Sequence, residues 1–413
     1  MHERRLVTIV RKFKVYLAAP VIVDLMPSQD FPLHREEPMT MKRRTWMNSV
    51  GLSAAAGSLG AVAQAVAADP PQTHPQPDAE TADLQRAKDL VRAHYEAIAT
   101  ATPETIAAVL EMRTSRNWLW RGMHPFHEKK GAADVAKDFW VPFLTAMRPV
   151  QRRPDIFLAG RNEIDKFSST WVVCMGHLMG LFTRPWLGIR PTGRIAMLRF
   201  AEFNRVEDKK IVETAFFFDI PHFMIQAGQN PFPPQTAAHL VQPGPATHDG
   251  LMHTPQDAAT GVRTLAVINA MMKDMGDDKA APHDRHARSW HEDMIWWGPA
   301  GIGATYTIDG YMKQHTGPFN AALSDGYKFN GHLCRLAEGH FGGFFGWPNL
   351  TVTNSGGYLG MTASPKPADM RVVDLYREAE GKLAENWIFI DLLHYLNMQG
   401  LDVLSRMASL GPG

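Results

Sequence analysis

A sequence element that occurs twice constrains the fold of this 413-residue chain more than any other feature. Glu213 to Gly228 and Glu385 to Gly400 match at Glu, Phe, Asp, His and Gly, with no gap between the matched positions. In both copies apolar residues precede the Asp, and a short apolar segment follows it and ends at the Gly. This pattern predicts a buried strand that leads into a short helix. A chain that contains the element twice is expected to contain two homologous domains.

Four further landmarks recur in the same order in the two halves. They pair Asn117–Gly122 with Asp293–Gly298, Phe139–Met147 with Tyr311–Leu323, Gly176–Phe182 with Gly339–Phe345, and Arg199–Arg205 with Arg371–Arg377. In each half helical patterns come first and long strand patterns follow, which predicts an α+β fold with an antiparallel sheet in each domain. We expect a first domain at residues 83–228, a proline-rich linker at 229–256 and a second domain at 257–413.

The first 68 residues have the pattern of an export signal. Arg43 and Arg44 precede a mildly apolar, alanine-rich run that ends in small residues up to Ala67. This order is typical of a twin-arginine signal with cleavage after Ala67, and the alternative is a basic N-terminal tail. We therefore expect a periplasmic or secreted protein, with a flexible linker at residues 69–82.

Composition argues against nucleic acid as a partner, against membrane insertion and against a disulfide framework. After residue 68 the chain has 34 Lys and Arg against 37 Asp and Glu, and a nearly neutral surface does not favour nucleic acid as a partner. No later segment is apolar over the length that a membrane-spanning helix needs, so we expect no stable membrane insertion. Cys174 and Cys334 lie at positions that the repeat does not equate, and we expect two ordinary thiols.

Three kinds of segment make the chain similar to the SnoaL-like polyketide cyclases of the nuclear-transport-factor-2-like superfamily. Leu187–Arg194 resembles the family's Gly-x-x-Pro-Thr-Gly-Arg/Lys turn, Lys210–Glu213 and Lys382–Glu385 resemble its Lys-Ile-x-Glu strand opening, and Asp219 and Asp391 match its strand-end Asp. The similarity covers roughly residues 85–410, although the second half lacks the Thr-Gly-Arg ending of the turn. It implies two tandem cones, each a curved antiparallel sheet wrapped around helices and an apolar pocket. It also implies that the two cones pack on each other as an intramolecular pseudo-dimer.

The resemblance implies catalytic roles for Asp391 and Asp219. In the cyclases the strand-end Asp is a general acid/base that acts on a polyketide without metal or organic cofactor. An apolar pocket can raise the pKa of a carboxyl group toward neutrality, as this role requires. His394 and His222 follow one helical turn later and are either pocket acids or hydrogen-bonded residues of a helix face. An Asp between a strand and a helix is also a natural N-cap, and the sequence leaves both roles open.

Eight further residues are candidates for substrate binding: Trp387, Phe389, Trp297, His340, Glu385, Trp120, His177 and Phe217. In a strand the alternating residues Glu385, Trp387, Phe389 and Asp391 point to one side. The histidines lie in Gly-His-x-x-Gly segments and could equally be structural, and the tryptophans could fill the core. The first copy has Ala215 where the second has Trp387, so the two pockets are expected to differ.

These observations favour an exported, cofactor-free acid/base enzyme of the aldol-cyclase, isomerase or lyase type. Its substrate would be a small apolar carbonyl compound, and the second domain is the better candidate for the active one. The alternatives are a hydrolase with the same pocket, or a non-catalytic module that binds a hydrophobic ligand or docks on a protein. His283, His286 and His291 fit no strong metal-binding template, so we expect a surface segment there and no bound metal.

Overall fold

A computed structural model describes residues 77–239, 242–277, 279–323 and 326–409. The expected export signal lies outside the described residues. Residues 77–82, expected within a flexible linker, form the first turns of helix α1 (Pro77–Ala99). Among the described residues no helix has the length and apolar character needed to cross a membrane.

The first half of the described chain builds a 6-stranded sheet and the helices that cover it. Besides α1, its helices are α2 (Ile106–Arg113), α3 (Ala132–Val135), η1 (Ala136–Trp140), α4 (Val141–Ala146), η2 (Glu163–Asp165) and α5 (Ile220–Gln226). Its strands are β1 (Thr114–Gly122), β2 (His127–Lys130), β3 (Met147–Arg161), β4 (Thr170–Phe182), β5 (Ile195–Glu207) and β6 (Lys210–Phe218). They are arranged in the order β2-β1-β6-β5-β4-β3.

The second half repeats this plan. Its helices are α6 (Ala258–Met275), α7 (Pro282–Ser289), α8 (Ile308–Tyr311), η3 (Met312–Thr316), α9 (Gly317–Leu323), η4 (Tyr358–Gly360), α10 (Leu392–Met398) and α11 (Val403–Ser409). Its strands are β7 (Trp290–Trp297), β8 (Ala304–Tyr306), β9 (Lys328–Phe329), β10 (Cys334–Glu338), β11 (Phe341–Asn354), β12 (Ser364–Ala379) and β13 (Lys382–Ile390). The sheet has the order β10-β11-β12-β13-β7-β8, and β9 pairs with β11.

Each sheet contains one parallel pair, β1 with β6 and β7 with β13, where the sequence predicted antiparallel pairing throughout. The reason is that helices and several strands separate the members of each pair in sequence, which permits a parallel crossover. The halves also share a π-helix, η1 in the first and η3 in the second. These equivalences confirm an α+β fold built from two tandem domains.

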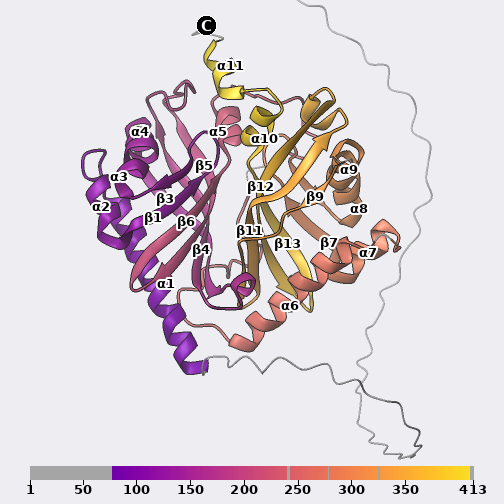
Figure 1. Cartoon of the computed structure of the whole chain (residues 1–413), viewed down its shortest axis with the longest axis horizontal. Helices are drawn as coiled ribbons and strands as arrows, with labels where there is room; N and C mark the ends of the chain where they lie inside the picture. The colour runs from indigo at the N-terminus through magenta and orange to yellow at the C-terminus, as the bar shows by residue number, and fades with distance from the viewer. Residues whose placement is uncertain (1–76, 240–241, 278, 324–325, 410–413) are drawn as a thin grey trace, which may run out of the picture. The chain divides into compact units, whose positions relative to one another are not determined.

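The two sheets face each other, and each half carries its main helices on the side away from the other half (Figure 1). Each sheet therefore has an inner face against its own helices and an outer face against the other sheet. On the inner face of the first sheet, Phe216 lies 5.5 Å from Phe139 of η1 between ring centroids. On the outer faces, Phe203 and Phe217 lie 5.0 Å and 6.0 Å from Phe345.

Candidate functional site

Asp219 directly follows β6, and its carboxylate makes hydrogen bonds to both halves. One carboxylate oxygen accepts a hydrogen bond from the His222 N–H at 2.9 Å, which makes Asp219 the N-cap of α5. The other oxygen accepts from the Ala300 N–H of the second half at 3.0 Å. The His222 ring lies 3.2 Å from the side-chain nitrogen of Gln226, and burial lowers the pKa of His222.

Asp391 makes the equivalent contacts from the second half. Its carboxylate accepts from the His394 N–H at 3.2 Å as the N-cap of α10, and from the His124 N–H of the first half at 3.0 Å. Arg371 lies 3.3 Å from the same carboxylate. Burial raises the pKa of Asp391, while Arg371 acts in the opposite direction. The N-cap role that the sequence left open is thus present in both copies, and both carboxylates are occupied by hydrogen bonds.

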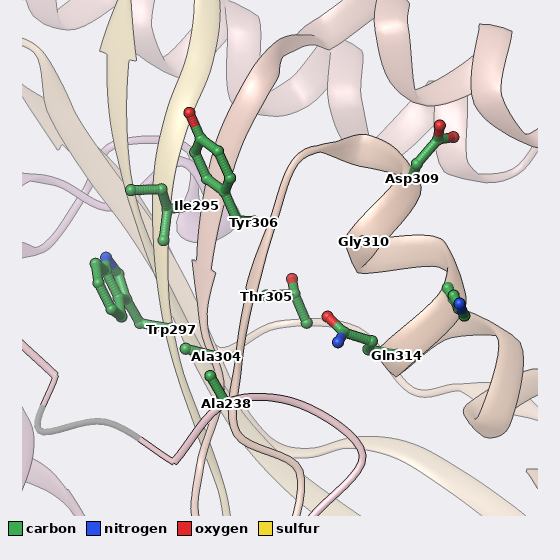
Figure 2. Close-up of a pocket in the computed structure, with 10 residues that line it drawn as sticks. Ala238, Ile295, Trp297, Ala304, Thr305, Tyr306, Asp309, Gly310 and Gln314 are labelled. Atoms are coloured by element: carbon green, nitrogen blue, oxygen red, sulfur yellow. The ribbon is translucent and has the colours of Figure 1, made fainter. Parts of the chain in front are cut away.

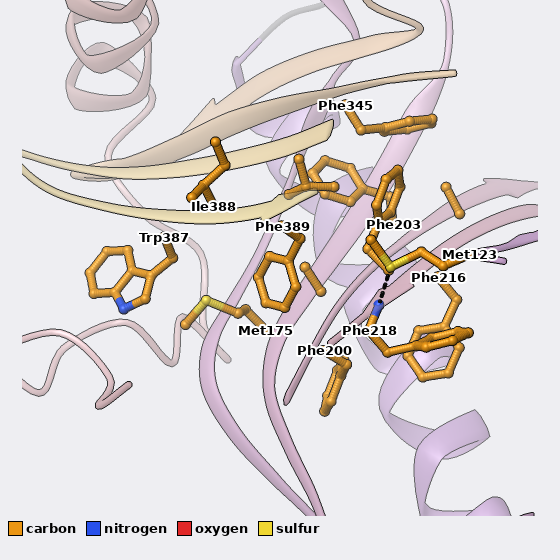
Figure 3. Packing of buried hydrophobic residues seen from close by; sticks show 14 of the residues in the cluster. Met123, Met175, Phe200, Phe203, Phe216, Phe218, Phe345, Trp387, Ile388 and Phe389 are labelled. Atoms are coloured by element: carbon orange, nitrogen blue, oxygen red, sulfur yellow. Dashed lines mark hydrogen bonds between the residues drawn. The ribbon is translucent and has the colours of Figure 1, made fainter. Parts of the chain in front are cut away.

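Four of the candidate substrate-binding residues lie on the outer faces of the sheets or at their ends. Phe217 packs on Trp347 with ring centroids 5.5 Å apart, and Phe389 lies under the Arg199 guanidinium at 3.9 Å. The Trp387 indole donates to the Pro243 carbonyl at 2.9 Å, and Glu385 is paired with Arg377 at 2.5 Å. Figure 3 shows Trp387 and Phe389 on the side of β13 opposite to Ile388. The predicted alternation is therefore present, but its shared side faces the linker and the first half.

The remaining candidates are dispersed. Trp120 is buried in the first core between Phe126 and Phe139, whereas Trp297 lines a depression at the β7–β8 end of the second sheet (Figure 2). His340 lies in the turn between β10 and β11 and is paired with Glu378 at 2.7 Å, its side chain more than half exposed.

The strand register corrects the proposed equivalence of His177 and His340. Cys174 pairs with Glu202 and Phe344 with Asp374, two acids that the repeat equates. Cys174 and Phe344 are therefore equivalent positions of the repeat. Three residues further along β4 and β11, His177 is equivalent to Trp347 and not to His340. The shared Gly-His-x-x-Gly pattern does not indicate equivalent positions, because short glycine-containing segments recur by chance in curved strands.

The inner face of the second sheet differs from that of the first. Phe200, Phe216 and Phe218 of the first half are 0%, 0% and 1% exposed, and they pack among the rings around Phe139. Their counterparts in the second half are Val372, Ile388 and Ile390, which retain 6%, 7% and 7% exposure. The side chains at three matched positions are therefore smaller and slightly more exposed in the second half than in the first.

A buried carboxyl group lies on this inner face. Asp374 accepts a hydrogen bond from the Asn386 side chain at 3.1 Å and is 9% exposed. Burial raises the pKa of Asp374 to about 7, and the hydrogen bonds from Asn386 and Tyr376 act in the opposite direction. Tyr311 lies close enough for the Asp374 charge to raise its pKa further than burial alone.

The equivalent acid of the first half is neutralised. Glu202 forms an ion pair with Arg152 at 2.7 Å, and both side chains are less than 10% exposed. Arg152 in turn lies 3.8 Å above the Tyr95 ring. Among the residues described, no salt bridge involves Asp374. One repeat position thus holds a paired carboxylate in the first half and an unpaired carboxyl group in the second.

Aromatic and polar side chains line the rest of the second interior. The His315 ring stacks on Trp296 at 4.0 Å and lies 5.9 Å from Phe319, which is 5.9 Å from Tyr358. Tyr358 and Tyr395 are 5.7 Å apart, and neither hydroxyl has a hydrogen-bond partner among the described residues. Burial lowers the pKa of His315 to about 3, so this ring is neutral. This part of the second half combines an aromatic wall with two hydroxyl groups that lack a partner among the described residues.

The sequence prediction does not include Asp374 as a site residue, although Asp374 lies within a landmark that recurs in both halves. Arg371–Arg377 and Arg199–Arg205 both carry an acid at the fourth position. An acid between apolar neighbours in both copies was the available signal. No group of three or more His, Cys, Asp or Glu among the described residues is arranged to hold a metal ion. His283, within α7, is paired with Glu292 at 3.1 Å.

Comparisons with known proteins concern the fold. No family model matches the sequence, and the comparison with curated proteins gives no match. Among solved structures, a candidate SnoaL-like polyketide cyclase from a Jannaschia species is 15% identical, with a TM-score of 0.29, and covers 39% of this chain and 100% of its own. An NTF2-like protein from Burkholderia xenovorans is 12% identical, with a TM-score of 0.27, over 33% of this chain and 96% of its own. The cyclase candidate IdmH from Streptomyces antibioticus is 14% identical, with a TM-score of 0.26, over 33% and 99%. These are the families that the sequence resemblance names, and each match corresponds to about a third of the chain.

Proposed function

We propose that the second half is a cofactor-free acid/base enzyme for a small, largely apolar carbonyl compound, with Asp374 as the group that moves the proton. The observation that carries the proposal is a buried carboxyl group without a cationic partner among the described residues, at the position where the first half has an ion pair. The twin-arginine pattern at Arg43 and Arg44 supports the further proposal that the enzyme acts outside the cytoplasm.

The proposed chemistry follows from the pKa of Asp374. Near pH 7 about half of such a group is ionised, so it can accept a proton from the carbon next to a carbonyl and afterwards return it. Proton removal converts the substrate to an enolate, and Asp374 becomes a neutral carboxylic acid. The acid returns the same proton to another carbon in an isomerase, or to the alkoxide formed by aldol closure in a cyclase. The Tyr311 hydroxyl group, which lies close enough to Asp374 for the carboxylate charge to add to burial in raising its pKa, would donate to the enolate oxygen.

Replacement of Asp374 by Asn is expected to reduce proton exchange on a model ketone by roughly 10²–10⁴-fold. The measurement is deuterium incorporation next to the carbonyl of cyclohexanone and of 1-tetralone in D₂O, followed by NMR. The wild-type rate should rise with pH and reach half its maximum near pH 7, because the ionised form of Asp374 is the base. Asp284→Asn, a change in a side chain 78% exposed on the same half, is the matched control and should leave the rate unchanged.

Two further variants separate this proposal from its rivals. Ile388→Phe restores the residue found at the matched position Phe216, so it should fill the interior and stop exchange while the protein stays folded. Asp391→Asn tests the role that the family resemblance implies. The proposal is wrong if Asp391→Asn removes exchange and Asp374→Asn does not, or if neither ketone exchanges faster with wild-type protein than with buffer.

A further inference from the structure

Three histidines lie together where the two halves meet beside Asp391. His124 lies in the turn between β1 and β2 (residues 123–126), His127 begins β2, and His394 belongs to α10. The ring centroids of His124 and His127 are 5.3 Å apart, and those of His127 and His394 are 5.6 Å apart. His127 therefore contacts one imidazole of its own half and one of the other half, and the cluster forms part of the interface.

The cluster includes a permanent cation. The Arg371 guanidinium of β12 lies 3.2 Å from His127 Nδ1 and 3.3 Å from the Asp391 carboxylate. Because a guanidinium can only donate, Nδ1 must accept, and His127 must be neutral for this hydrogen bond to form. Protonation of His127 would replace the hydrogen bond with two adjacent cations. The contact between β2 of the first half and β12 of the second therefore depends on a neutral imidazole.

Other charges surround the rings and Arg371. They comprise four carboxylates and one further cation: Asp391, Asp402, Glu128, Asp369 and Lys129. Glu128 is paired with Arg121, and Lys129 is paired with Asp138. Within the described part of the chain, none of these carboxylates forms a salt bridge with an imidazole of the cluster. A proton taken up by the cluster would therefore have no direct counter-charge.

Burial lowers the pKa of all three histidines, to about 3 for His394. Arg371 acts in the same direction on each ring, whereas Asp391 and Asp402 oppose the shift at His124. Such groups are neutral while the interface is closed and take up protons when it opens. The closed arrangement is therefore most stable above pH 6.5, the ordinary histidine value, and loses stability as the pH falls below it.

The other end of the same interface offers a comparison. There the Ala300 N–H donates to the strand-end aspartate of the first half, as the His124 N–H does to that of the second. The register of the two edge strands places Gly303 at the position of His127. Two of the three cluster histidines thus have no counterpart at the other end, so the cluster is not a requirement of the fold.

We propose that this cluster is a pH-sensitive switch between the two halves. In mild acid the imidazoles take up protons, repulsion from Arg371 breaks the contact with His127, and the turn between β1 and β2 separates from α10 and β12. At neutral pH the contact forms again. The switch involves neither Asp374 nor a ligand, so it does not rest on the proposed acid/base activity.

The test is hydrogen–deuterium exchange of the full chain between about pH 7.5 and pH 5, followed by mass spectrometry and corrected for the intrinsic pH dependence of exchange. Each imidazole that is protonated only in the open state raises the opening constant by up to about 10-fold per pH unit. Over this range, fragments that cover the turn between β1 and β2 and α10 should lose at least about 10-fold more protection than fragments around Ala300.

Two variants locate the effect. His127→Gln keeps an oxygen that can accept from Arg371 but takes up no proton, so it should leave protection at pH 7.5 unchanged and weaken the pH dependence by up to about 10-fold per pH unit. His340→Gln is the matched control. It changes a side chain that is 56% exposed in the turn between β10 and β11, and it should alter neither quantity.

Two results would overturn the inference. One is protection at the cluster that stays constant as the pH falls, or that falls equally in every fragment because acid unfolds the whole protein. The other is a His127→Gln protein in which the turn keeps the wild-type pH dependence. Neither measurement uses a ketone, so failure here and failure of the acid/base proposal can be told apart.

Discussion

Replacing Lys88 by Met is expected to lower the free energy of unfolding by about 3–5 kcal/mol, because it leaves a buried carboxylate without its cation. Lys88 is 0% exposed. Its ammonium group lies 2.6 Å from Glu338 of β10 and donates to the Met252 and Thr254 carbonyls at 3.0 Å and 2.9 Å. The second Glu338 oxygen accepts from the Ala159 N–H at 2.7 Å. The ion pair of Lys88 and Glu338 thus connects α1, the linker and both sheets.

The measurement is guanidinium unfolding followed by circular dichroism. Arg86→Met, two residues before Lys88 on the exposed side of α1, is the matched control and should change stability by less than about 0.5 kcal/mol. A Lys88→Met/Glu338→Gln double variant removes both charges and should recover part of the loss. A loss below about 1 kcal/mol for Lys88→Met alone would show that the ion pair does not hold the halves together.

The duplication could be predicted from the sequence because it rests on order and spacing. The element around Asp219 and Asp391 forms a strand followed by an N-capped helix in both copies, as its residue pattern indicates. The matched landmarks also include irregular structure, because each half contains a π-helix at the same place in its order of elements. Local patterns of this kind depend on neighbouring residues and need no knowledge of the partner surface.

The site could not be predicted in the same way because β13 is buried on both faces. Alternation shows that Glu385, Trp387 and Phe389 share a side and that Asn386 and Ile388 share the other. It does not show which side meets the helices, since a sheet between helices and a second sheet has two apolar faces. The sequence prediction assigns the pocket to the side with two aromatic residues, whereas the structure places this side against the linker and the first half.

A comparison between the copies would have pointed to the interior. Phe216 and Phe218 align with Ile388 and Ile390, so the second half loses ring volume at two positions on one face of the strand. Matched differences in side-chain volume indicate where space opens, provided that the face is known. The face itself depends on how the two sheets pack, which no local pattern encodes.

Asp374→Asn is also expected to raise the free energy of unfolding, by up to about 4 kcal/mol at pH 8 and by little at pH 4. The folded-state pKa of Asp374 is about 7, raised from an ordinary value of 3.8. Between these two values the folded protein binds more protons than the unfolded chain, so this group makes stability fall as pH rises from about 4 to 7. The amide introduced by this substitution would keep the hydrogen bond from Asn386 and carry no charge, which removes that loss. The measurement is the difference in unfolding free energy between wild type and variant at the two pH values.

The matched variant in the first half should change stability in the opposite direction. Glu202→Gln leaves Arg152 buried without its carboxylate, and we expect a loss of about 3–5 kcal/mol at pH 8. If both variants lower stability at pH 8, Asp374 is stabilised in its charged form and the basis for the acid/base proposal fails. A second outcome is that Asp374→Asn stabilises the protein and abolishes ketone exchange. The unpaired buried carboxyl group would then lower the free energy of unfolding and be required for proton transfer. The first half would then contribute a filled, stabilising core, and the second half would contain a destabilising buried acid that performs the chemistry.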